Sequence, residues 1–313
     1  MRSRLLYAVA VLTLWAVTPV RAADTLSTPT VFYQDVAWAP DGNAVAFTAM
    51  INQKPSEVYT MVLRGKLVTR LTKNDAVDAG VCWSKDGAKL FFTSNRDGND
   101  EIYVMNADGG GMRRLTNHPG RDAAPCLSPD GNDIVFVSDR DGNPDLYIMS
   151  LNGATVERLT NTPGAEHNPR WSPDGRKVAC YLSAEGAKDQ VVVIDANTGD
   201  SRILGDAASG NSNPNWSIDG ASVIYCSAPA EGERWIFAAA ADGSKNDKLL
   251  PLPAFYAAYS PDGKRIAYIG GSWPSSNLYV IDYSDGTMRC LTCDITLDPE
   301  LVAETKPAKS KKK

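Results

Sequence analysis

Residues 83–116 of this 313-residue chain, WSKDGAKLFFTSNRDGNDEIYVMNADGGGMRRLT, decide its fold. The stretch holds three Asp-Gly steps separated by short apolar runs. About 44 residues further on the pattern returns as LSPDGNDIVFVSDRDGNPDLYIMSLNGATVERLT, beginning at Leu127. A pattern that recurs at a fixed period indicates an array of one supersecondary unit, so the repeat, rather than any single loop, predicts the architecture.

The turn that opens this unit occurs six times along the chain. Each copy places Asp-Gly three residues after a leading aromatic residue or Leu, and the copies follow one another after 45, 44, 44, 45 and 43 residues. The leading residues are Trp38, Trp83, Leu127, Trp171, Trp216 and Tyr259. We expect the recurrent Trp to pack between units rather than to stack on a ligand.

Each unit contains four short apolar runs, which in the second copy are residues 81–83, 89–94, 101–106 and 112–116. They are rich in Val, Ile, Phe and Tyr and are bounded by turn-forming residues, a pattern typical of β-strands. No sustained helical periodicity follows residue 23. The sequence therefore predicts an all-β, six-bladed β-propeller with four antiparallel strands per blade. The ring closes without a shared blade in this reading, unless residues 25–33 add a strand.

The two ends differ in composition from the repeats. Residues 1–22 combine Arg2 and Arg4 with an apolar run and small residues before Ala23, which is typical of a signal peptide, although an uncleaved anchor is the alternative. Residues 23–303 are then one propeller domain, and the lysine-rich residues 304–313 form a disordered tail. We expect an exported monomer, periplasmic or secreted, with no transmembrane span in its mature form.

The charge balance excludes one class of partner. The whole chain carries 32 basic and 37 acidic residues, and without residues 1–22 it carries 29 and 37, a net charge of −8. Without the tail the remaining body has a charge of about −12. A nucleic-acid binder would show the opposite balance.

Six cysteines leave the disulfide pattern open. Cys82 and Cys126 occupy the same position of adjacent repeats, and Cys290 and Cys293 form an isolated Cys-x-x-Cys, a weak signal for a metal or redox motif. Because successive side chains of a strand point to opposite faces of the sheet, we expect Cys180 and Cys226 on opposite faces of their sheets. In adjacent blades these can be the faces that meet, so we consider a bridge between the two residues. Buried free thiols are the simpler alternative.

Motifs of catalysis are missing. Only His118 and His167 are present, and no nucleophile elbow, phosphate loop or dinucleotide fingerprint occurs. The loop at residues 139–145 has the alternating oxygen side chains of a calcium site, but a hairpin turn needs the same residues. We favour the turn and expect no enzyme activity, no catalytic residue, no metal site and no cofactor.

A ring of acidic and polar residues is the candidate binding surface. Five residues before the leading residue, where each inner strand begins, the repeats carry Asp78, Asp122, Glu166 and Asn211, with Asp35 and His167 nearby in register. Gathered carboxylates at one mouth of the channel would attract a cationic group or a basic peptide. The alternative is that these residues cap strand ends and bind water.

The repeat WSPDG…I.F.S.RDGN.EIYVM..DG…RLT resembles that of TolB-type β-propellers over residues 30–292. TolB is a periplasmic protein whose propeller binds the envelope lipoprotein Pal and whose N-terminal segment contacts TolA. TolB carries an α/β domain before the propeller, and we expect none here because few residues precede the first repeat. The resemblance therefore implies an exported protein-binding scaffold whose partner is a protein or peptide, such as a Pal-like envelope lipoprotein. The alternatives are a propeller-type enzyme, such as a polysaccharide lyase or a peptidase-associated propeller, and a small-ligand-binding propeller.

Overall fold

The computed structural model describes residues 30–205, 210–228, 234–250, 252–272 and 274–297. The predicted signal peptide and lysine-rich tail lie outside these residues. The described chain forms 24 strands and no helix, in six four-stranded antiparallel sheets made of consecutive strands. The prediction of an all-β, six-bladed propeller is confirmed.

The blades follow chain order, and each runs from an inner to an outer strand. Blade 1 consists of β1 (Val31–Trp38), β2 (Ala44–Ile51), β3 (Glu57–Val62) and β4 (Leu67–Arg70). Blade 2 consists of β5 (Asp78–Trp83), β6 (Lys89–Ser94), β7 (Glu101–Asn106) and β8 (Arg113–Arg114). Blade 3 consists of β9 (Asp122–Leu127), β10 (Asp133–Ser138), β11 (Asp145–Ser150) and β12 (Val156–Arg158). Blade 4 consists of β13 (Ala165–Trp171), β14 (Lys177–Ser183), β15 (Gln190–Asp195) and β16 (Ser201–Leu204). Blade 5 consists of β17 (Gly210–Trp216), β18 (Ser222–Ala228), β19 (Trp235–Ala240) and β20 (Asn246–Leu250). Blade 6 consists of β21 (Ala254–Tyr259), β22 (Arg265–Ser272), β23 (Ser275–Asp282) and β24 (Met288–Cys290).

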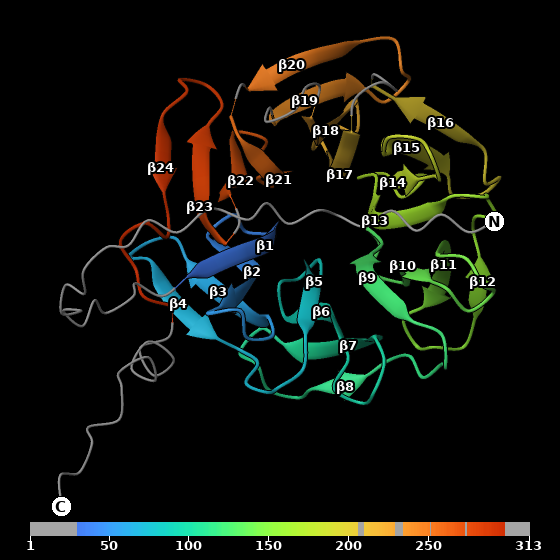
Figure 1. The fold of residues 1–313 in the computed structure, drawn as a ribbon, viewed down its shortest axis with the longest axis horizontal. Helices are drawn as coiled ribbons and strands as arrows, with labels where there is room; N and C mark the ends of the chain where they lie inside the picture. Colours follow the sequence, from blue (N-terminus) through green and yellow to red (C-terminus); the bar gives the residue numbers. More distant parts are fainter. Residues whose placement is uncertain (1–29, 206–209, 229–233, 251, 273, 298–313) are drawn as a thin grey trace, which may run out of the picture.

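Figure 1 shows the six sheets arranged as a ring, with β1, β5, β9, β13, β17 and β21 around its centre. Each inner strand contacts the inner strands of both neighbouring blades, and β1 contacts β21. The channel between them has two mouths. We call the one where inner strands begin the start-side mouth, and the one with the Asp-Gly turns after the inner strands the turn-side mouth.

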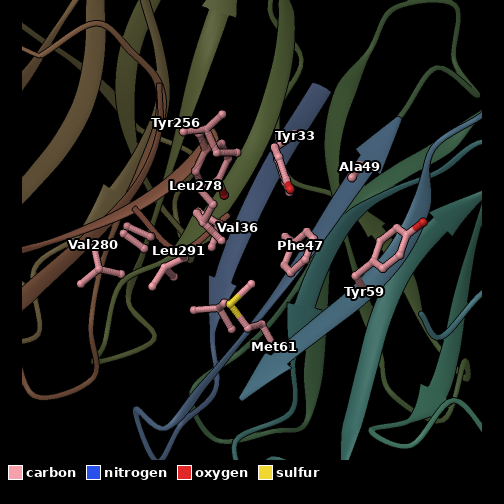
Figure 2. Close-up of a cluster of buried hydrophobic side chains, with 14 of the residues drawn as sticks. Tyr33, Val36, Phe47, Ala49, Tyr59, Met61, Tyr256, Leu278, Val280 and Leu291 are labelled. Carbon is pink, nitrogen blue, oxygen red and sulfur yellow. The ribbon is translucent and has the colours of Figure 1, made fainter. Parts of the chain in front are cut away.

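The ring closes through a hydrophobic seam between blades 1 and 6, and within residues 30–297, apart from the gaps given above, no strand is shared between two sheets. Figure 2 shows this cluster, in which Phe47 and Met61 of blade 1 lie near Leu278 and Val280 of blade 6. Across the same seam the backbone N–H of Tyr33 donates to the Ser276 hydroxyl at 2.8 Å. Closure therefore depends on side chains from the two ends of the propeller.

The recurrent Trp residues join neighbouring blades, as the sequence predicted. The indole N–H of Trp83 donates to the Ala37 carbonyl at 3.1 Å, and that of Trp216 donates to the Arg170 carbonyl at 2.9 Å. Trp38 makes the equivalent bond to Ala258 at 3.1 Å, across the closing seam. One residue type thus serves the same packing function in three of the blades.

The loops considered for calcium are hairpin turns. Gly142 N–H donates to the Asp139 carbonyl at 2.9 Å, and the Asp141 carboxylate accepts from the Tyr147 hydroxyl at 2.5 Å. The amide of Asn143 donates to the carbonyls of Thr162 and Gly164 at 3.0 and 2.7 Å. The Asn143 amide thus holds the loop to the connection before blade 4, while Asp141 holds it to the following strand, β11 (Asp145–Ser150).

The cysteine pairing corrects one prediction. Cys180 and Cys226 are free and buried, whereas Cys290 and Cys293 form a disulfide with a Cα–Cα distance of 5.7 Å. Cys180 packs into the core between blades 3 and 4, and Cys226 packs into the core between blades 5 and 6. The two thiols do point to opposite sheet faces, but to the faces turned away from each other.

Candidate binding site at the start-side mouth

The ring of acidic residues lies beneath the surface of the start-side mouth. The side chains of Asp78, Asp122 and Asn211 are fully buried, and that of Glu166 is 1 % exposed. The described positions agree with the predicted register at the beginning of β5, β9, β13 and β17. Their burial means that these groups do not present charge directly to a partner.

Arginines neutralise the first two carboxylates. Both oxygens of Asp78 accept from Nη2 of Arg96 at 3.1 Å, and both oxygens of Asp122 accept from Nη2 of Arg140 at 2.9 Å. The Arg140 guanidinium also lies 4.8 Å from the ring centre of Tyr147, a cation–π arrangement. In blades 2 and 3 the arginine therefore cancels the negative charge that the sequence predicted at the channel mouth. The signal was present in the sequence, because both Arg residues lie in equivalent Arg-Asp-Gly loops.

Blades 4 and 5 lack this arginine, and the residue at the ring position changes with it. Glu166 accepts from the Thr162 hydroxyl at 2.6 Å, while its second oxygen has no partner among the described residues. Burial raises the pKa of Glu166 to about 7, so the carboxyl is partly neutral near neutral pH. Blade 5 carries the uncharged Asn211. The buried position therefore holds a carboxylate paired with arginine in blades 2 and 3, a partly neutral carboxyl in blade 4 and an uncharged amide in blade 5.

Asp35 belongs to a deeper level of the channel. Its carboxylate accepts from the backbone N–H of Gly80 in blade 2 at 2.7 Å and from that of Thr48 at 3.0 Å. Burial raises the pKa of Asp35, and these hydrogen bonds oppose that rise. Asp35 therefore fastens β1 to β5 instead of facing a partner.

Similar polar links join other inner strands at this level, where each of them has a β-bulge. The amide of Asn168 donates to the Asn213 side chain at 2.5 Å, and the amide of Asn213 donates to the Phe255 carbonyl at 2.6 Å. Ala124, Asn168 and Asn213 adopt positive φ angles of 53, 49 and 54°. The bulges bring neighbouring strands together around the axis.

A cavity of about 320 Å³ opens above these bulges on the side of blades 2 to 4. Gly80, Ala124 and Asn168 are among the residues that line it at the level of the bulges. Polar lining residues nearer the loops are Asp100, Arg121, Asp139 and His167. Arg121 pairs with Asp100 at 2.7 Å, and its backbone N–H donates to Asp139, also at 2.7 Å. A partner would thus meet a mixed polar rim over a largely apolar interior.

His167 is the one residue of the predicted six that lines this cavity. Its ring stacks on Tyr181 with 4.8 Å between centroids. Burial lowers the pKa of His167, with Asp189 acting in the opposite sense, so the imidazole is neutral at pH 7. A neutral imidazole can both donate and accept a hydrogen bond. Sequence reasoning did not select Asp100 or Arg121 as site residues, and it considered Asp139 only as part of a calcium-like loop or turn.

The turn-side mouth leads to a second cavity of about 310 Å³, lined by residues of all six blades. Aromatic residues including Trp38, Trp171 and Tyr259 line it, together with Cys82, Cys126, Arg170 and Tyr256. Nη2 of Arg170 in β13 donates to the Tyr256 hydroxyl of β21, two blades away. Sequence reasoning missed Arg170, although it occupies the repeat position of Cys82 and Cys126.

Two further observations apply to the described residues alone. No three of their His, Cys, Asp and Glu side chains gather closely enough to hold a metal ion. Within the same ranges, no helix has the length and apolar character needed to cross a membrane.

Known structures share the architecture. TolB from Acinetobacter baumannii is 28 % identical, with a TM-score of 0.62 over 68 % of this chain and 53 % of that protein. A putative TolB from Agrobacterium tumefaciens is 24 % identical, with a TM-score of 0.64 over 74 % and 87 %. An oligogalacturonate lyase in complex with manganese, 17 % identical, has a TM-score of 0.60 over 84 % and 79 %. The likenesses under 25 % identity show the fold alone.

The chain spans about half the length of the Acinetobacter baumannii TolB. The sequence model of the family described as the TolB beta propeller domain matches residues 30–116 and 95–254, well over half of the chain. These residues include the six-fold repeat from its first copy into the fifth blade, and the fold they form is the one the repeat predicts. The chain therefore belongs to the TolB β-propeller domain family.

Proposed function

We propose that this protein is a non-catalytic, protein-binding propeller of the bacterial cell envelope, which acts after export to the periplasm. The partner we propose is a protein or peptide segment, such as an envelope lipoprotein of the Pal type. Family membership supports the binding role, and the signal-peptide pattern of residues 1–22 supports the compartment.

The cavity at the start-side mouth is the observation that carries this proposal. Its interior of about 320 Å³ accepts one or two side chains, and its rim offers the neutral imidazole of His167 and the Asp100–Arg121 pair. Interfaces of this kind combine an anchoring pocket with a polar, solvent-accessible rim. The buried acids beneath the rim hold the strands that shape it.

Filling the cavity tests the proposal. Ala123 lines it and is half-buried, so Ala123→Trp should occupy the anchoring space. We expect at least about tenfold weaker binding of the partner captured from envelope extract, measured by biolayer interferometry with the purified proteins. Ala88→Trp is the matched control, because Ala88 is exposed in a turn at the opposite mouth.

Undiminished capture by Ala123→Trp with an unchanged melting temperature would show that the binding surface lies elsewhere. If that variant unfolds, His167→Ala provides a second removal of a rim contact. Turnover of oligogalacturonides or peptides by the purified chain would favour the enzymatic alternative. Binding of a small molecule without capture of any protein would favour a ligand-binding propeller.

A further inference from the structure

One ring of equivalent positions surrounds the channel near the turn-side mouth. The inner-strand residue that precedes the leading aromatic residue or Leu lines the turn-side cavity in all six blades. In chain order these residues are Ala37, Cys82, Cys126, Arg170, Asn215 and Ala258. Blades 2, 3 and 4 therefore place two thiols and a guanidinium side by side around an open cavity, and the binding role proposed above uses none of them.

The two thiols are close in space. The backbone N–H of Leu127 donates to Sγ of Cys82 at 3.3 Å, so this sulfur lies against the segment that carries Cys126. Two residues earlier on the same strands, a Cβ placed on Gly80 would lie 3.2 Å from the Cα of Ala124. Each thiol also affects the ionisation of the other. Rotation about χ1 changes the separation of two sulfurs without moving the strands.

The remaining cysteines provide a contrast. Cys180 and Cys226 are 0 and 1 % exposed and pack into apolar cores between blades. Burial raises the pKa of both thiols, that of Cys226 to about 12, which keeps them protonated and unreactive. Cys126 is only half-buried, and Cys82 is 8 % exposed.

The charges around Cys126 favour its thiolate. Its hydrogen bond with Cys82 lowers the pKa of Cys126, burial opposes this, and the positive charge of Arg170 lowers it further. Tyr256 of β21 faces the same space and accepts a hydrogen bond from Arg170, and Asp35 of β1 lies near Arg170. The same thiol–thiol hydrogen bond raises the pKa of Cys82, so only one of the pair ionises readily.

We propose that Cys82 and Cys126 form a redox-active dithiol site that reacts with small disulfides through the turn-side mouth. The Cys126 thiolate attacks one sulfur of the small disulfide, which forms a mixed disulfide and releases the first small thiolate. Cys82 then loses its proton and attacks the Cys126 sulfur, which releases the second small thiolate. The protein loses two electrons and two protons, and one small disulfide becomes two small thiols.

Reaction with 2,2′-dithiodipyridine, an uncharged aromatic disulfide, tests this site. All proteins are full-length and carry Cys290→Ser and Cys293→Ser, so that the existing disulfide contributes no thiols. We expect the reduced protein to release two pyridinethiones rapidly and to finish about 2 Da lighter, without an adduct. Peptide mapping should locate the new bond between Cys82 and Cys126.

Single variants separate the two thiols. Cys82→Ser should release one pyridinethione and retain the adduct on Cys126, whereas Cys126→Ser should react at least about tenfold more slowly. Cys180→Ser should behave as the parent. An adduct that stays on the parent protein, equal rates for the two single variants, or no reaction before unfolding would each overturn the proposal.

A pH profile tests the part played by Arg170. Removing its positive charge in Arg170→Gln should shift the midpoint of the fast reaction to higher pH, because the thiolate loses a stabilising charge. Tyr256→Phe keeps that charge and removes the hydrogen bond from Arg170, so its midpoint should stay close to that of the parent. An unchanged profile in Arg170→Gln would show that the arginine does not activate the thiol.

Discussion

At the scale of single residues, Asp122 and Glu166 are buried at the same repeat position, but only Asp122 is paired with an arginine. Asp122 is held by Arg140 at 2.9 Å with its side chain fully buried. Asp122→Asn leaves the guanidinium without its counter-ion, so we expect a loss of about 3 kcal/mol in the free energy of unfolding, measured by urea denaturation. Glu157→Gln on the exposed strand β12 is the control and should change stability by less than about 0.5 kcal/mol. Equal midpoints for the two variants would contradict a structural role for the ion pair.

The raised pKa of Glu166 predicts that the stability of the protein depends on pH. Because the pKa of Glu166 is raised from 4.5 to about 7, the folded protein holds this proton more tightly than the unfolded chain does. Its contribution to stability is complete below about pH 4.5 and is lost as the pH rises through about 7. Glu166→Gln should be the more stable protein at pH 8, by on the order of 2 kcal/mol, and should match the parent at pH 4. Parallel pH–stability curves would show that Glu166 ionises as it does in water.

At the scale of elements, the inner strands depend on bulges that require unusual backbone angles. Ala124 has a φ of 53°, a left-handed conformation that disfavours a side chain. Ala124→Gly should therefore stabilise the protein by up to about 1 kcal/mol in urea denaturation. Ala123→Gly, at the neighbouring position without a positive φ, should destabilise it by about 0.5–1 kcal/mol. Destabilisation by both substitutions would mean that the bulge strain is relieved in some other way.

At the scale of the whole molecule, stability depends on ring closure. Deleting residues 254–290 removes blade 6 and exposes the seam around Tyr33, Phe47 and Met61. Because each blade buries its apolar faces only against its neighbours, we expect the truncated chain to lose its sharp thermal transition and to bind a hydrophobic dye. Calorimetry provides the measurement. A truncated chain that melts as cooperatively as the full chain would disprove a closed, interdependent ring.

The strands follow from local information. In blade 2 the predicted runs 89–94 and 101–106 coincide with β6 and β7. The apolar run 81–83 covers only the second half of the inner strand, which begins at Asp78, the ring position of the repeat. Its first half is polar and bulged and lacks the apolar signal. The outer strand is reduced to Arg113 and Arg114, since an edge strand with one neighbour needs little apolar character.

The sequence by itself determined the number of blades, the four-strand unit and the interblade use of Trp, because turn chemistry and strand composition are local properties that recur in each copy. Only the tertiary structure decided which side chains meet. It paired the buried acids Asp78 and Asp122 with arginines, turned Cys180 and Cys226 away from each other, and brought Arg170 of blade 4 to Tyr256 of blade 6. Repeat register states that two residues are equivalent, but contact also depends on the rotation between blades and on side-chain rotamers, and both of these are set by packing over the whole ring.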